Sequence, residues 1–247
     1  MKKIVSIVLV LALVAAFCAG CSSDKKTIKV GASSTPHAEI LESVKDDLAK
    51  DGWKLEVVRL DWDSLVPAVQ TGKVDAVIAG QSMTEERMQQ VDFAGPYLYA
   101  SIVCMTKQNS KYANATSLAD LAGAKCTSQL GTIWYTTCLP QINGALIQTA
   151  QETAPSMLMA LETGAVDFIC TDMPTAQGAL IAYSDLKILD LPENAFKVDE
   201  GDINIGISVK KGNTELKDKI NSALAGMTAD DFNKIMNEAT KIQPLSK

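Results

Sequence analysis

The sequence predicts an α/β fold of two similar lobes, each built on a mostly parallel sheet. The first observation is a weak internal repeat, in which residues 69–80, VQTGKVDAVIAG, are echoed by residues 161–172, LETGAVDFICTD. Each copy reads as a helix end, a glycine and a nearly continuous apolar strand, which a parallel sheet covered on both faces requires. Upstream of each copy, at 30–35 and 126–132, a strand runs into a polar turn. Because any α/β protein repeats such units, the repeat alone favours two lobes only slightly.

The composition and charge of the chain exclude some classes of function. The chain has 247 residues, of which 47% are hydrophobic, enough for one large domain or two modest ones. Its formal net charge is −6, so there is no excess of basic residues for phosphate groups, and nucleic-acid binding is not expected. His37 is the only histidine, which excludes sites that need several of them. We expect neither a metal nor a cofactor.

Residues 1–20 predict a secretory signal peptide. Two lysines precede an apolar stretch at 4–17, which is shorter than the about 20 residues of a membrane-spanning helix. Small residues then precede Cys21, and a polar tether over 21–26 follows, which resembles a bacterial lipobox with Cys21 as the lipidated, palmitate-carrying residue. Cys18 stands where a lipobox usually has leucine, and an ordinary signal peptide is the alternative.

Apolar spacing predicts the elements in the first half of the chain. Pro36 suits the first turn of a helix, and apolar residues recur at helical spacing after it. In chain order we expect a strand at 27–31, a helix at 36–50, a strand at 54–60, a helix at 64–70 and a strand at 74–79.

Two later strands indicate how the chain passes between the lobes. A strand at 99–106 would carry the chain into the second lobe, and a strand at 203–210 would carry it back. Two amphipathic helices are expected in the tail. The expected domains are lobe 1 at 27–99 with 204–247, and lobe 2 at 100–203.

The carboxyl ends of the expected strands predict where a ligand binds. Ligands of open parallel sheets bind beyond these ends. If two lobes face each other, the ends would line one cleft. The segments concerned are 33–35, Trp62, 80–82, 129–134 and 171–173.

Four cysteines follow the leader: Cys104, Cys126, Cys138 and Cys170. In an exported protein they can pair in any of three ways. Their apolar or strand-like flanks fit buried free thiols equally well. No Cys-x-x-Cys occurs, so a zinc or thiol-redox motif is weakly supported.

Several stretches match a known family pattern. They include DWDSLVPAVQTGKVDAVIAG at 61–80, SMTEERMQQVDFAGPY at 82–97 and ALETGAVDFICTD at 160–172. With the Ser-x-Thr-x-x-Arg…Phe-x-x-Pro-Tyr signature, residues 61–247 resemble the family 3 extracellular solute-binding proteins, the amino-acid receptors of bacterial ABC importers. Residues 29–52 are more similar to the methionine-binding lipoproteins. Both resemblances imply a two-lobed periplasmic-binding-protein fold of type II with the ligand between the lobes.

The resemblance places the carboxylate-binding cation at Arg87, because a guanidinium binds a carboxylate bidentately. Ser82 would add a hydroxyl donor, and Gly80 would let the ligand approach the backbone. Thr132 would complete the carboxylate cage, with Ile133 contributing its backbone amide. From the residues alone, a solvated arginine paired with a glutamate is the more ordinary interpretation of Arg87.

Asp172 ends the second apolar strand, where the resemblance implies that its carboxylate meets the ligand ammonium. The alternative is a turn or cap residue before Pro174. Trp62 and Trp134 would flank the cleft, with core packing as the alternative for each. His37 is expected at a helix start rather than against the ligand. The sequence does not decide which amino acid is bound, since two tryptophans admit cationic, aromatic or aliphatic side chains.

These expectations describe a substrate-binding lipoprotein that delivers a free amino acid to the permease of a bacterial ABC importer. We expect a monomer without catalytic activity, held by its N-terminal lipid at the outer face of the cell membrane or in the periplasm. An enzyme of the same fold, of the cyclohexadienyl or arogenate dehydratase kind, is the first alternative. It would need a positioned acid or base, for which Asp172 is the one strong candidate. An extracytoplasmic sensory module is the second alternative.

Overall fold

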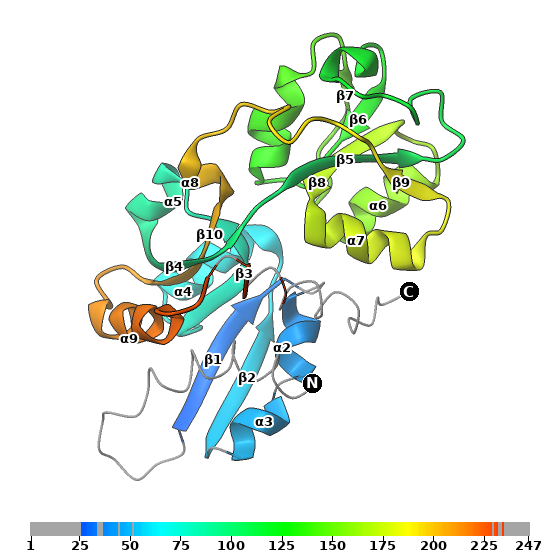
Figure 1. Cartoon of the computed structure of the whole chain (residues 1–247). Coiled ribbons are helices and arrows are strands. Elements are labelled where there is room, and N and C mark those ends of the chain that lie inside the picture. The colour runs from blue at the N-terminus through cyan, green and yellow to red at the C-terminus, as the bar shows by residue number, and fades with distance from the viewer. Residues whose placement is uncertain are drawn as a thin grey trace. The chain divides into compact units, whose positions relative to one another are not determined.

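The computed structural model describes residues 26–33, 37–43, 45–50, 52–228, 230, 231 and 234. The described residues form two compact units. Unit 1 contains those up to Tyr99 and from Gly201 onward, and unit 2 contains Ala100–Glu200. Each unit has its own five-stranded sheet with helices around it (Figure 1). The expected signal peptide, the lipidation site Cys21 and the second tail helix lie largely or wholly outside the described residues.

The sheet of unit 1 has the strand order β2-β1-β3-β10-β4. β1 pairs in parallel with β2 and with β3, whereas β10 pairs antiparallel with both β3 and β4. Four strands therefore run in one direction and only β10 runs against them. The strands are β1 (Lys26–Ala32), β2 (Trp53–Arg59), β3 (Ala76–Ser82), β4 (Val91–Tyr99) and β10 (Asn204–Lys210).

Short helices accompany this sheet. Of the helix expected at 36–50, the structure describes α2 (Glu39–Ser43) and α3 (Lys45–Lys50). Leu65, Val69, Val77 and Phe93 belong to a core cluster that joins α4 to β3 and β4. The other helices are the 3₁₀ helix η2 (Trp62–Ser64), α4 (Leu65–Gln70), α5 (Glu85–Gln90), α8 (Glu200–Ile203) and α9 (Thr214–Leu224).

The sheet of unit 2 repeats this topology, with the strand order β7-β6-β8-β5-β9. β6 pairs in parallel with β7 and β8, and β5 pairs antiparallel with β8 and β9. The reversed strand thus occupies the fourth place in both units. The strands are β5 (Ile102–Lys107), β6 (Lys125–Thr127), β7 (Leu146–Ile147), β8 (Phe168–Asp172) and β9 (Leu186–Ile188).

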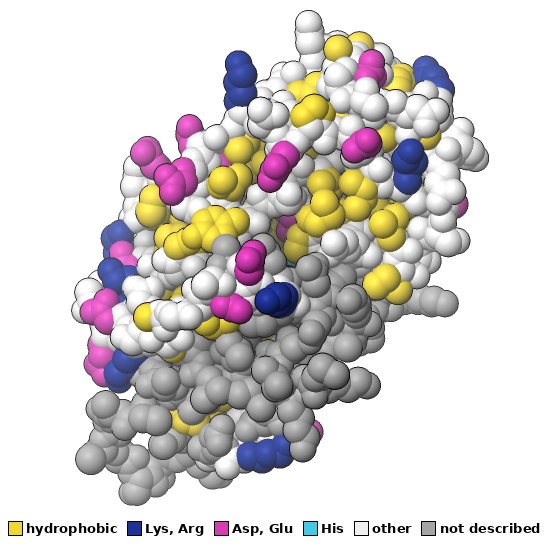
Figure 2. All heavy atoms as spheres, in the orientation of Figure 1, with side chains coloured by type: hydrophobic (Ala, Val, Ile, Leu, Met, Phe, Trp, Pro, Cys, Tyr) yellow, Lys and Arg dark blue, Asp and Glu magenta, His cyan; other side chains and the backbone are white. Residues whose placement is uncertain are grey.

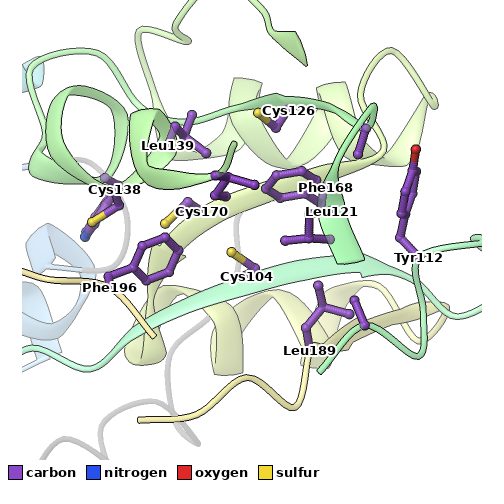
Figure 3. Close-up of a cluster of buried hydrophobic side chains, with 14 of the residues drawn as sticks. Cys104, Tyr112, Leu121, Cys126, Cys138, Leu139, Phe168, Cys170, Leu189 and Phe196 are labelled. Atoms are coloured by element: carbon purple, nitrogen blue, oxygen red, sulfur yellow. The ribbon is translucent and has the colours of Figure 1, made fainter. Parts of the chain in front are cut away.

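Two hydrophobic clusters form the core of unit 2. One contains Met157, Leu161 and Ile169 and lies under α6 and α7. The other contains Phe168, Leu139 and the cysteines (Figure 3). The helices are η3 (Leu118–Leu121), the π-helical η4 (Trp134–Cys138), η5 (Leu139–Gln141), α6 (Ala154–Glu162) and α7 (Met173–Ala182).

The internal repeat extends to individual hydrogen bonds. The amide of Asp75 donates to the carbonyl of Lys29 (2.9 Å), and the Lys29 amide donates to Oδ2 of Asp75 (2.8 Å). Asp167 and Lys125 make the same reciprocal pair at 2.8 and 2.7 Å. In each unit, the aspartate before one strand clamps the neighbouring parallel strand. The prediction of two similar, mostly parallel α/β lobes is confirmed.

The described surface is mixed in charge. On the face shown in Figure 2, lysine and arginine side chains are scattered among acidic ones. In the part of the chain that the structure describes, no helix has both the length and the apolar character needed to cross a membrane.

Candidate functional site

The residues expected to bind a ligand fall into two groups, one in each unit. In unit 1, Trp62, Gly80, Ser82 and Arg87 lie at or beyond the carboxyl ends of β2 and β3. In unit 2, Thr132, Ile133 and Trp134 follow β6, and Asp172 is the last residue of β8. Both groups therefore occupy the strand ends at which open parallel sheets bind ligands.

Arg87 is held in place by its local structure. Thr84 caps α5, and its Oγ1 accepts a hydrogen bond from the amide of Arg87 (3.3 Å). The Arg87 Nη1 donates to the carbonyl oxygen of Ser82 (3.0 Å), and the guanidinium lies 5.4 Å from the centre of the Trp62 ring. The structure thus brings together three of the predicted residues, Trp62, Ser82 and Arg87.

The electrostatic setting of Arg87 suits anion binding. Burial lowers the pKa of Arg87, while the carboxylates of Glu86 and Asp202 oppose that shift. Arginine nevertheless stays protonated, because its ordinary pKa is far above neutral pH. The guanidinium is therefore a partly desolvated, oriented cation, and such a cation interacts more strongly with a carboxylate than one in bulk water.

The backbone at Gly80 makes room for the ring of His37. Its φ is +71°, and a Cβ built at this position would lie 3.0 Å from both Cε1 and Nε2 of His37. The imidazole therefore occupies the space in which a ligand was expected to approach the backbone. Nδ1 of His37 lies 3.1 Å from Oγ of Ser33, and the Gly80 amide donates to the hydroxyl of Tyr97 (3.3 Å).

Burial lowers the pKa of His37 to about 4, so its ring is neutral at physiological pH. His37 lies five residues beyond the end of β1 at Ala32, on the side of the sheet edge at which ligands of parallel sheets bind. The contact with Gly80 could not be read from the sequence, because the two residues are far apart along the chain.

The residues after β6 in unit 2 are more deeply buried than expected. Thr132, Ile133 and Trp134 expose 3%, 7% and 8% of their surface, and the last two belong to a core cluster. Trp134 therefore contributes to core packing, the alternative considered for it. The Thr132 hydroxyl donates to the carbonyl of Gln129 (2.7 Å), so its single proton is already engaged and backbone amides remain the natural anion donors of this turn.

Asp172 combines a structural and an electrostatic feature. It is the N-cap of α7, where its Oδ1 accepts from the amide of Thr175 (2.8 Å). Burial raises the pKa of Asp172 and outweighs the hydrogen bonds that lower it, and no cationic side chain of the described residues contributes to the shift. The cap role, which was the alternative for Asp172, is present, and the carboxylate is desolvated without a described cation to balance it. A ligand ammonium would supply that charge.

The two segments of the unit 2 group are fixed to each other. β6 and β8 are neighbours in the sheet, with Thr127 opposite Ile169. Ser128, just beyond β6, donates its Oγ to the carbonyl of Cys170 (2.6 Å). The neighbouring Thr171 Oγ1 is buried without a hydrogen-bond partner in the described structure. Within the described ranges, no cluster of His, Cys, Asp and Glu side chains has the arrangement of a metal site.

Comparison with known proteins decides the family. The family model of bacterial extracellular solute-binding proteins, family 3, matches residues 37–240. The chain belongs to this family. Its fold is the two-lobed α/β fold of type II, which it shares with solved amino-acid-binding proteins.

Two curated relatives illustrate the match to this family. A "Probable histidine-binding protein" of Campylobacter jejuni is 31% identical over 143 residues, which is 58% of this chain and 54% of that protein. The chain thus aligns with about half the length of that relative. ABC transporter arginine-binding protein 1 of Escherichia coli is 28% identical over 251 residues, covering 96% of this chain and 98% of the relative.

Solved amino-acid-binding proteins are similar to this chain over most of its length. An ancestral arginine-binding protein, solved with glutamine and with arginine, is 31% identical. It matches with TM-scores of 0.69 and 0.67, over 87% of this chain and 98% of the other.

Proposed function

We propose that this family 3 protein binds a free amino acid and delivers it to the permease of a bacterial ABC importer. Two charged side chains, one in each unit, carry the proposal. Arg87 in unit 1 is an oriented, partly desolvated cation, and Asp172 in unit 2 is a desolvated anion with no described cation acting on its pKa. An amino acid carries one group of each opposite sign. Relatives named for histidine and arginine support the substrate class.

The residues take separate roles in this proposal. Arg87 and Ser82 hold the ligand carboxylate, with the amides at Thr132 and Ile133 as further donors. Asp172 holds the ammonium. The ring of Trp62, which already stacks with the guanidinium of Arg87, also borders the ligand. Gly80 and Trp134 act indirectly: Gly80 makes room for the His37 ring, and Trp134 supports the turn that carries Thr132 and Ile133.

Binding without catalysis is part of the proposal. The relatives named above are binding proteins for amino acids, which favours transport over a dehydratase or a sensory module. In the described part of the site, Asp172 is the strongest acid–base candidate, and pairing with an ammonium would occupy it. A purified protein that turns over prephenate or arogenate would contradict this part of the proposal.

Export and anchoring complete the proposal. Residues 1–20 act as a signal peptide, Cys21 carries the lipid, and residues 21–26 form the tether. The protein then works as a monomer at the outer face of the cell membrane or in the periplasm. Its lobes comprise residues 27–99 with 204–247, and 100–203.

A ligand screen tests the substrate class. A ligand present at 100 times its Kd stabilises the folded protein by about 2.7 kcal/mol, which a thermal-shift assay resolves. We expect one or a few of the twenty amino acids to raise the Tm, and titration calorimetry should then give one site per chain. The Arg87→Ala variant is the control. If no amino acid shifts the Tm or gives heat of binding, the proposed substrate class is wrong.

A further inference from the structure

Cys104 on β5 and Cys170 on β8 stand directly opposite each other in an antiparallel strand pair. Their carbonyl groups both point away from the partner strand. The carbonyl of Cys104 accepts from the amide of Leu189 (2.9 Å), and that of Cys170 accepts from Oγ of Ser128 (2.6 Å). The two cysteines therefore form a non-hydrogen-bonded pair, the kind in which facing Cα atoms approach to about 4.5 Å.

A second hydrogen bond fixes the same register. The amide of Met173 donates to the carbonyl of Ser101 (2.9 Å), three positions from the cysteine pair. Hydrogen-bonded and non-hydrogen-bonded pairs alternate along an antiparallel ladder, so an odd step from that bonded pair leads to a non-bonded one. Both observations assign Cys104 and Cys170 to the closer of the two pair types.

The two thiols lie in the same part of the core. Both cysteines are fully buried in one core cluster, and the Cys170 thiol interacts with those of Cys104 and Cys138 (Figure 3). Cys126 lies on β6 opposite Phe168. All four cysteines are free in the structure.

We propose that Cys104 and Cys170 form a disulfide that joins β5 to β8 when the chain folds outside the cytoplasm. A Cα separation of about 4.5 Å lies within the range that disulfides span, at its short end. Cys138 is a weaker partner for Cys170 because it lies on η4 and has no strand register that sets its distance. This inference goes beyond amino-acid binding and depends only on export.

The chemistry is a thiol–disulfide exchange with a disulfide oxidant, such as oxidised glutathione or the disulfide of a thiol oxidase. The two thiols together lose two protons and two electrons, and a bond forms between their Sγ atoms. The S–S bond of the oxidant breaks and yields two thiols. Burial raises the pKa of Cys170 and suppresses the reactive thiolate, so the exchange takes place before the core of unit 2 closes.

Thiol mapping tests the pairing. The full-length chain is expressed with export, and the chain from Ser22 onward is refolded in a mixture of reduced and oxidised glutathione. Each sample is denatured in iodoacetamide and digested with and without reduction. We expect a peptide pair joining Cys104 to Cys170 that disappears on reduction, with Cys126 and Cys138 alkylated. Four alkylated cysteines in the refolded sample, or Cys170 joined to another cysteine, would overturn the proposal.

Two serine variants provide a matched comparison. Cys126→Ser removes a buried thiol outside the pair and should keep the linkage, whereas Cys104→Ser should abolish it. Reduction should lower the Tm of the unmodified chain by on the order of 5–10 °C and leave that of Cys104→Ser unchanged. An equal response of both chains to the reductant would refute the assignment. The mapping of the unmodified chain stands even if a variant fails to fold.

Discussion

Acid should destabilise this protein through its single histidine, His37. The pKa of His37 is about 4 in the folded chain and near the ordinary 6.5 in the unfolded chain, because folding buries the ring. Between these values the unfolded state binds more protons, so the free energy of unfolding falls as the pH falls. Linkage gives a loss of about 2 kcal/mol between pH 7 and pH 5, rising to about 3 kcal/mol below pH 4.

Urea denaturation at pH 7, 6 and 5 measures this loss, with His37→Gln as the comparison. Glutamine keeps a polar side chain beside Ser33 but does not titrate. All carboxylates are common to both chains, so their contributions cancel in the difference between the two free energies of unfolding. That difference should shift by about 2 kcal/mol in favour of His37→Gln from pH 7 to pH 5. A difference that stays within about 0.5 kcal/mol would show that the ring is not held neutral by burial.

Three further predictions concern the site and the repeat. Arg87→Ala should lose on the order of 2–5 kcal/mol of amino-acid binding by titration calorimetry, and Arg87→Lys should recover only part; affinity within about threefold of the parent would place the carboxylate elsewhere. Asp172→Asn keeps an oxygen for the amide of Thr175, so it should leave the Tm nearly unchanged yet weaken binding more than tenfold, whereas an unchanged Kd would remove Asp172 from the site. Asp75→Ala and Asp167→Ala each remove an aspartate that clamps a neighbouring strand, so each should lower the free energy of unfolding by about 1–3 kcal/mol in urea, and a neutral result for either would contradict the clamp.

The sequence predicted the architecture well because its signals were local. An aspartate, a run of apolar residues and a preceding Thr-Gly are enough to mark the repeated strand, and the clamps at Asp75 and Asp167 explain why the same residues recur. The place of β10 between β3 and β4 was not predictable, because it depends on pairings between residues far apart in the chain.

Part of the candidate site was also predictable, because some of its residues belong to local sequence motifs. Arg87, Ser82 and Trp62 follow from a contiguous motif, and the structure brings them together. Trp134 could not be assigned from sequence, since a tryptophan near a strand end fits a core and a pocket equally well. The contact between His37 and Gly80 could not be predicted, because it joins residues far apart in the chain.

The place of β10 has a consequence for the order in which the chain can fold as it is made. Unit 2 is continuous in sequence, so residues 100–200 suffice to complete its sheet. Unit 1 is not, because β3 and β4 share no edge until β10 inserts between them. About a hundred residues separate the end of β4 from the start of β10. In a chain synthesised from its N-terminus, β3 and β4 therefore each keep an unpaired edge until those residues have been made. Unit 1 is therefore the first unit to be synthesised and the last to complete its sheet.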